Sequence, residues 1–251
     1  MIEVFQVYNL DFWHWILFAL CGLFIGMAKT GLSGLGLMVV PLMAGLFGGR
    51  ESVGILLPVL IVADFFAVKY FNRHASWKHV IRLLPWAMVG ILTGAYFGHE
   101  INDTQFKKAL AVIIVLGIGI MLWQDLRSKK VSVPDSWWFA AVLGLAGGFT
   151  TMVGNAAGPV MALYLLSMRL PKNIYIGTGA WFFLIINISK VPLHVFYWET
   201  IKTQTLLLDL TAIPVVIIGA IAGKKIVDII PEKIFRALIL FSTLAAALFL
   251  F

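Results

Sequence analysis

Apolar segments separated by short polar stretches recur along the whole chain. Most are close to, or somewhat shorter than, the roughly 20 residues that a helix needs to cross a bilayer. We expect ten of them in two groups of five: Trp13–Ala28, Thr30–Gly48, Ser52–Val68, Val80–Gly98 and Ala109–Trp123, then Trp137–Met152, Asn155–Ser167, Tyr175–Val195, Leu206–Gly223 and Ala237–Phe251. The pattern predicts an all-α integral membrane protein.

The composition supports this class and leaves little room for others. Hydrophobic residues make up 61% of the 251 residues and charged residues 12%, whereas soluble domains average about 25% charged residues. Because no polar stretch is long enough for a soluble domain, we expect a single membrane domain over residues 1–251. The net charge of +7 resides largely in short loops, where basic residues indicate membrane topology rather than nucleic-acid binding.

Enzyme chemistry has no support in the sequence. Cys21 is the only cysteine, which excludes an internal disulfide and a cysteine-based metal site. The five histidines lack the spacing of metal ligands, and no phosphate loop, zinc-protease motif or nucleophile elbow is present. We therefore expect no catalytic residue, metal or cofactor.

The two groups of segments share an ordered series of residues, which indicates an internal duplication. One series from the first half reappears in the second in the same order: Gly22, Gly26, Gly36, Gly54, Asp64, Pro85, Gly90 and Gly94, matched by Gly144, Gly148, Gly158, Gly177, Asn187, Pro214, Gly219 and Gly223. We expect repeats over about 12–125 and 137–251. Duplicated halves are a common plan of transporters, whose substrate binds where the halves meet. The paired Gly90 and Gly94, like Gly219 and Gly223, are expected to serve helix packing.

The distribution of basic residues predicts the orientation. If the first two segments of each half enter and leave on the same side, 13 of the 19 Lys and Arg share one face. They lie in four loops: Lys69–Arg82, Gln124–Ser136, Arg169–Lys172 and Lys224–Arg236. The positive-inside rule places these loops in the cytoplasm and both termini outside the plasma (inner) membrane. Each half then crosses an odd number of times, so the two repeats are inverted relative to one another.

A glycine-rich stretch opens each half and contains the candidate binding residues. The first, GLFIGMAKTGLSGLGLMVVP, carries Lys29; the second is GLAGGFTTMVGNAAGPVMA. We expect broken or re-entrant helices here, which a membrane tolerates only around a cavity or inside protein. A helix that restarts at a break directs free N–H groups at the gap and favours an anion. The candidate substrate-binding residues are Lys29, Thr30, Ser33, Gly34, Gly36, Thr150, Thr151, Asn155 and Gly158. The alternative for Lys29 is a side chain that snorkels from a helix end.

Further polar residues lie within the third segment of each half. Asp64, Asn187 and Lys190 are candidates for a coupling site or a charge pair. Asp64 either carries a coupling proton or neutralises Lys29 or Lys190, because an unpaired carboxylate at this depth is costly. Lys190 alternatively snorkels toward the loop that follows it. Asp209 lies near the start of its segment, so we expect it close to the membrane surface.

Several of these stretches resemble one family of membrane proteins. The openings GLSGLGLMVVP and GNAAGPVMALYLL, and the continuation LPKNIYIGTGAWFFLIINISKVPLH, resemble the TauE/SafE family of sulfite and organosulfonate transporters. The resemblance covers nearly the whole chain. It implies a duplicated helical membrane protein that moves small sulfur-containing anions, often outward.

The leading hypothesis is a secondary transporter, acting as an exporter, for a small anion such as sulfite, a sulfonate or another sulfur-containing organic anion. The anion is expected near the midplane, between the two glycine-rich breaks. The alternative is an anion channel in which the same gap forms a selectivity filter. The expected partners are the small anion and the lipid bilayer, with a homodimer left open and nucleic acid not expected.

Overall fold

The computed structural model describes residues 10–32, 35–102, 137–168 and 170–231, with five isolated positions at 104, 105, 108, 112 and 234. Two of the expected apolar segments, Ala109–Trp123 and Ala237–Phe251, fall outside this part of the chain apart from Val112. The loop Gln124–Ser136 also falls outside it.

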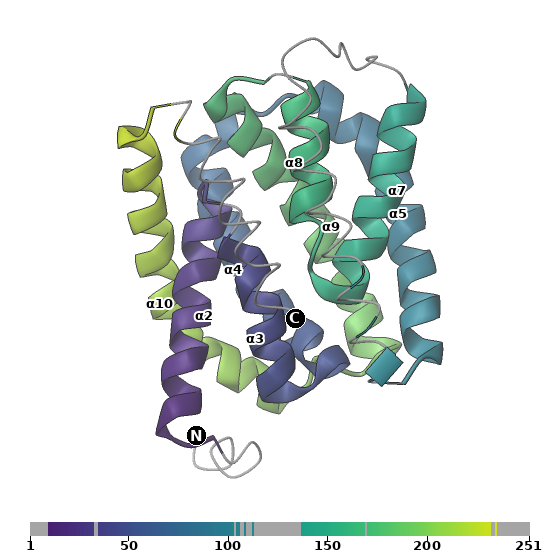
Figure 1. Ribbon diagram of the computed structural model, residues 1–251, viewed down its shortest axis with the longest axis vertical. Helices are drawn as coiled ribbons and strands as arrows, with labels where there is room; N and C mark the ends of the chain where they lie inside the picture. Colours follow the sequence, from purple (N-terminus) through teal and green to yellow (C-terminus); the bar gives the residue numbers. More distant parts are fainter. Residues whose placement is uncertain are drawn as a thin grey trace.

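The described chain is a bundle of helices (Figure 1). The first half contributes α2 (Phe12–Lys29), α3 (Leu35–Phe47), α4 (Gly49–Phe71) and α5 (Trp77–Glu100), with a short 3-10 turn at Asn72–His74. The second half contributes α7 (Trp137–Gly154), α8 (Gly158–Ser167), α9 (Lys172–Phe196) and α10 (Thr203–Ile229). In this part of the chain six helices are long and apolar enough to cross a membrane, and α3 and α8 are shorter. The expected all-helical, multi-pass architecture is confirmed.

Each half begins with two helices separated by a short connection. Between α2 and α3, Gly31 adopts φ 139°, and a Cβ there would come within 2.4 Å of Val227 Cγ2. Only glycine satisfies both conditions. Between α7 and α8, Asn155 adopts φ 52°, a left-handed conformation that asparagine tolerates better than most residues. Pro159 then lies in the first turn of α8, where a missing N–H breaks no helical hydrogen bond.

Glycines bring two pairs of helices into close contact. A Cβ on Gly26 of α2 would come within 2.2 Å of the Val216 carbonyl oxygen of α10. A Cβ on Gly148 of α7 would come within 2.0 Å of the Ala87 carbonyl oxygen of α5. Small residues of this kind let backbones approach closely inside a membrane. The helices α2 and α10 therefore pack together much as α7 and α5 do.

The glycines on the partner helices α5 and α10 complete these contacts. Gly90 faces the Leu145 carbonyl oxygen of α7, and Gly219 faces that of Leu23 in α2. Gly94 and Gly223 are similarly enclosed by α7 and α2. The packing role predicted for these four glycines is confirmed.

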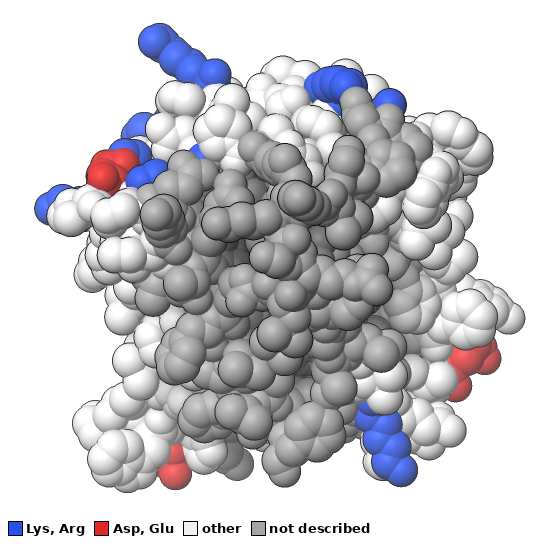
Figure 2. Space-filling view, turned by 45° about the horizontal axis from the view of Figure 1, so that its top comes forward, with Lys and Arg blue, Asp and Glu red and all other residues white. Residues whose placement is uncertain are grey.

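Three of the four basic loops meet at one end of the bundle. The Lys172 ammonium, at the start of α9, donates to the carbonyls of Val227 at 2.7 Å and Ile230 at 3.0 Å, near the end of α10. The Ser76 amide, in the loop after α4, donates to Thr178 Oγ1 of α9 at 2.9 Å. In Figure 2 most of the Lys and Arg side chains gather at one edge of the molecule.

The opposite end is marked by Arg50 and Lys202. The Arg50 guanidinium, at the start of α4, donates to the Ile101 carbonyl at 2.6 Å, just after α5. Lys202, just before α10, lies 3.7 Å from the Glu51 carboxylate. Because α2 runs in the same direction as α10 and α3 leads directly into α4, the first opening pair starts and finishes at this end. The pair α7 and α8 starts and finishes at the Lys172 end.

At the Arg50 end, Asp11 caps α2. Its carboxylate accepts a hydrogen bond from the His14 backbone N–H at 3.0 Å. That bond lowers the pKa of Asp11. Such a cap satisfies one of the free N–H groups of the first turn and helps to fix where α2 begins.

Candidate functional site

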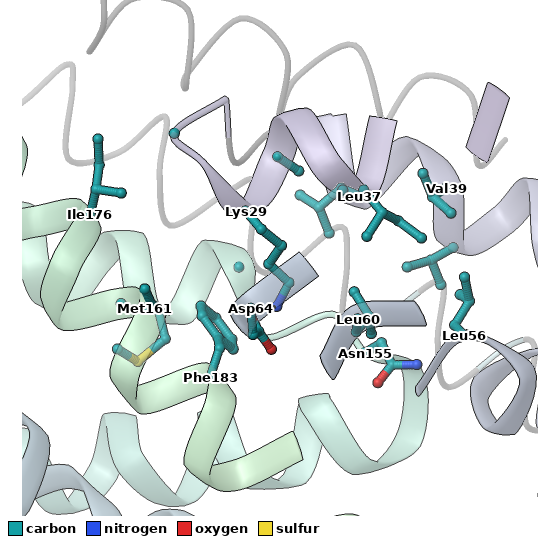
Figure 3. A pocket seen from close by; sticks show the side chains of 18 of the residues that line it. Lys29, Leu37, Val39, Leu56, Leu60, Asp64, Asn155, Met161, Ile176 and Phe183 are labelled. Atoms are coloured by element: carbon teal, nitrogen blue, oxygen red, sulfur yellow. Dashed lines mark ion pairs between the residues drawn. The ribbon is translucent and has the colours of Figure 1, made fainter. Parts of the chain in front are cut away.

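A cavity lies where the two helix connections face α4 and α9. Its volume is about 90 Å³, and a single water needs about 10–15 Å³, so the cavity has room for a small anion. Figure 3 shows side chains from both halves around it. The polar and glycine residues that line it are Lys29, Gly31, Gly36, Asp64, Asn155, Gly158, Tyr175 and Gly179.

Lys29 enters this cavity paired with a carboxylate. Its ammonium lies 2.9 Å from Asp64 Oδ1, and the two side chains are 15% and 0% exposed. The ammonium also lies 4.2 Å from the centre of the Phe183 ring, a distance at which the face of an aromatic ring attracts a cation. Lys29 therefore points into the bundle (Figure 3) instead of snorkelling from the helix end.

Asp64 is held from both halves of the chain. While Oδ1 faces Lys29 of the first half, Oδ2 accepts a hydrogen bond from Asn187 Nδ2 of the second at 2.6 Å. Of the two lysines considered as its partner, Asp64 contacts Lys29 directly. The matched positions Asp64 and Asn187 thus meet at the contact between α4 and α9.

Lys190 is fully buried one turn further along α9. Its ammonium donates to the Thr151 carbonyl at 3.0 Å, to Thr151 Oγ1 at 3.1 Å and to Asn155 Oδ1 at 2.7 Å. The last carbonyls of a helix lack intrahelical partners and carry partial negative charge, which suits an ammonium. Lys190 therefore satisfies the end of α7 and does not snorkel. Within the described residues no carboxylate lies at ion-pair distance from it.

Two basic side chains and one carboxylate lie around the cavity. Lys29 pairs with Asp64, the one carboxylate that contacts either lysine in the described part of the chain, whereas Lys190 has only neutral partners there. A buried ammonium without a carboxylate is unfavourable unless it gives up its proton or an anion compensates it. At the cavity wall, α8 begins at Gly158, so free N–H groups of its first turn also favour negative charge there.

The predicted site residues that the structure describes fall into three groups. Lys29, Gly36, Asn155 and Gly158 line the cavity, as does Asp64. Asn187 bonds to Asp64, Lys190 bonds to Asn155, and Thr151 in turn accepts a hydrogen bond from Lys190. Thr30 and Thr150 turn their hydroxyls to carbonyls of the preceding turn, those of Gly26 and Ala146. Ser33 and Gly34 lie outside the described residues.

Apolar side chains make up the rest of the wall, and the sequence reasoning did not single them out. They include Leu56, Leu60, Met161 and Phe183. For most of them an apolar residue in an apolar helix gives no signal. Phe183 is the exception, because it precedes Asn187 by four residues and Lys190 by seven, a spacing that puts all three on one helix face.

Asp209 is buried between helices. Its side chain is only 4% exposed and lies against α4. Its position near the start of α10 is as expected, but the packing of α4 against α10 buries the carboxyl group.

Within the described residues, no group of three or more His, Cys, Asp or Glu side chains is placed to hold a metal ion. Comparison with known families gives a match to the family of sulfite exporters TauE/SafE over residues 18–250. No curated protein and no solved structure matches the chain. The matched range includes both helix connections, Lys29, Asp64 and the cavity between them. The chain therefore belongs to the TauE/SafE sulfite exporter family and is a membrane transporter, not an enzyme.

Proposed function

We propose that this protein is a secondary transporter of the plasma membrane that exports a small sulfur-containing anion, such as sulfite or a sulfonate. The observation that carries the proposal is the cavity at the two helix connections, which is lined by Lys29 and by the start of α8 and has a second buried lysine, Lys190, bonded to Asn155 of its wall. Family membership supports sulfur-containing anions as the substrate class.

The bound anion accepts hydrogen bonds from three directions in this proposal. Lys29 supplies a charged donor, and the first turn of α8 supplies backbone N–H groups. The Asn155 side-chain amide lies beside them on the wall, where one N–H of Nδ2 donates to the Val53 carbonyl at 3.1 Å and the other is left for the anion. The apolar walls exclude water, which strengthens each of these interactions relative to a site in solvent. Asp64 keeps Lys29 in place when the site is empty and remains beside it when the anion binds.

The two halves act as inverted repeats, and the substrate lies near the midplane between them. The equivalent packing of α2 with α10 and of α7 with α5 supports this arrangement. The opening pairs also start and finish at opposite ends of the bundle. Rocking of one half against the other would then expose the cavity to each side in turn, as in other duplicated transporters. The basic Lys172 end faces the cytoplasm, and both termini lie outside.

Direct binding to purified protein tests this proposal. A thermal-shift screen of sulfite, sulfate, thiosulfate, alkanesulfonates and carboxylates, followed by calorimetry of those that stabilise the protein, should give saturable binding of at least one sulfur-containing anion. Because a ligand that binds only the folded state raises stability in proportion to the logarithm of its concentration, the shift should grow with anion concentration and not with the matched chloride salt. Stabilisation by none of these anions would contradict the proposal.

A further inference from the structure

A second buried carboxyl group lies away from the anion cavity. Asp209, in α10, is 4% exposed, and neither carboxylate oxygen has a hydrogen-bond partner within the described part of the chain. It lies in a groove of about 320 Å³ between α4 and α10, where Pro58 and Val59 of α4 are among its neighbours. Apart from Asp209 and Thr203, the groove is lined by apolar side chains.

Most charged groups on the surrounding helices have other partners, and Lys69 and Lys225 lie near the opposite ends of α4 and α10. On α4, Arg50 donates to the carbonyls of His99 and Ile101, Glu51 lies near Lys202, and Asp64 pairs with Lys29 of α2. At the start of α2, His14 contacts Asp11, and at the far end of α10, Lys224 contacts Asp228. None of the described cations is paired with Asp209. A carboxylate buried without a cation or a donor is unfavourable, whereas the protonated acid is neutral.

We infer that Asp209 is a proton-binding site that couples anion export to proton movement. The carboxylate takes up one proton to become the neutral acid and releases it again when water reaches the group. Asp209 is the seventh residue of α10, about 9 Å along the helix from its start. That start lies at the Arg50 end of the bundle, so protons exchange with water on the side of the membrane that this end faces. The inference rests on the proposed function, since coupling needs a transported anion.

The structure supplies a physical link between Asp209 and the anion cavity. Pro58, which lines the groove, has no N–H to donate to the Gly54 carbonyl four residues earlier, so α4 is weakened at this point. Asp64 lies six residues further along the same helix. On its other side α10 packs closely on α2, which ends at Lys29. An ionised Asp209 draws in water and loosens the contact between α4 and α10, while the neutral acid closes it.

Transport by full-length protein in proteoliposomes tests the inference. The probe is labelled sulfite, or the sulfonate that binds best, and the measurements are equilibrium exchange without a gradient and net flux driven by an imposed pH gradient. The variants are Asp209→Asn, which resembles the neutral acid but cannot titrate, and Asp209→Glu, which can. Asp228→Asn is the matched control, because it removes a half-exposed carboxylate from the same helix.

We expect the Asp209→Asn protein to exchange the anion at a rate within about threefold of the parent rate. Its net flux driven by the pH gradient should be at least tenfold lower than that of the parent. Asp209→Glu should keep this flux with a shifted pH midpoint, and Asp228→Asn should resemble the parent. The inference is overturned if the flux driven by the pH gradient is the same in Asp209→Asn as in the parent. It is also overturned if the net flux of the parent does not depend on the pH gradient. If Asp209→Asn does not fold, an unshifted midpoint in Asp209→Glu overturns it. Absence of exchange in the parent protein would instead contradict the proposed function.

Discussion

Replacing Lys29 with methionine separates its two interactions, one with Asp64 and one with the proposed anion. Methionine keeps much of the side-chain volume and removes the charge. A charge-assisted hydrogen bond contributes about 1.5–3 kcal/mol, and about 1.4 kcal/mol corresponds to a factor of ten. We therefore expect Lys29→Met to weaken anion binding roughly tenfold to a hundredfold.

The same substitution should also lower stability, for a separate reason. Asp64 is fully buried 2.9 Å from the Lys29 ammonium, and removing one partner of a buried pair costs about 3–5 kcal/mol. The neutral acid avoids an unpaired buried charge, so the lower end of the range is expected. The double variant Lys29→Met/Asp64→Asn removes both charges of this pair and should recover most of the stability. It should not recover anion affinity.

Calorimetry with sulfite or a sulfonate measures the affinity, and thermal unfolding in detergent measures the stability, after each variant has been shown to be monodisperse. Asp64→Asn alone, which keeps the ammonium, should bind the anion within a few-fold of the parent. If Lys29→Met binds the anion as tightly as the parent, Lys29 serves only as the partner of Asp64 and the anion binds elsewhere. If Asp64→Asn abolishes binding in folded protein, the carboxylate itself contacts the substrate.

Three further predictions concern the second lysine, the helix contacts and the orientation. Lys190→Met removes the donor that holds the Asn155 side chain at the cavity wall, so anion affinity should fall at least fivefold in calorimetry; unchanged affinity would show that Lys190 does not act on the anion. Gly148→Ala, whose Cβ would come within 2.0 Å of the Ala87 carbonyl oxygen, should lower thermal stability by about 1–3 kcal/mol. Gly45→Ala, where no atom lies within 4 Å of the added Cβ, is its control, and equal stability of the two would contradict the proposed packing. In a cysteine-free background, Thr203→Cys should react with a membrane-impermeant thiol reagent from outside and Asn72→Cys should not; the reverse pattern would invert the orientation.

The fold follows from the sequence because its main determinants are local. Apolar stretches of helical length predict the helices, and glycines repeated at matched positions predict which surfaces approach closely. Gly26 and Gly148 are spaced as equivalents in the sequence and occupy equivalent tight contacts in the structure. The choice of partner helix is not local, since α2 packs on α10 and α7 on α5, each across the boundary between the two halves.

The site was predictable only where a residue is unusual for its surroundings. Lys29 and Asp64 stand out as charges in apolar segments, and both line the cavity. The hydroxyl of Thr30 also stands out, yet it bonds to the Gly26 carbonyl within its own helix, which is the common arrangement for a threonine in a helix. Which lysine pairs with Asp64 depends on the relative placement of α2, α4 and α9. Spacing along the chain does not contain that information.

Efflux of labelled sulfite from proteoliposomes tests the central claim most directly. The parent protein should release sulfite faster than empty liposomes, with a rate that saturates as the internal concentration rises, and Lys29→Met should lower that rate at subsaturating sulfite. Alkanesulfonates in excess should compete, and chloride should not. Efflux equal to that of empty liposomes for sulfite and for every sulfonate tested would contradict the account, and a rate that rises linearly without saturation would indicate a channel in place of a transporter.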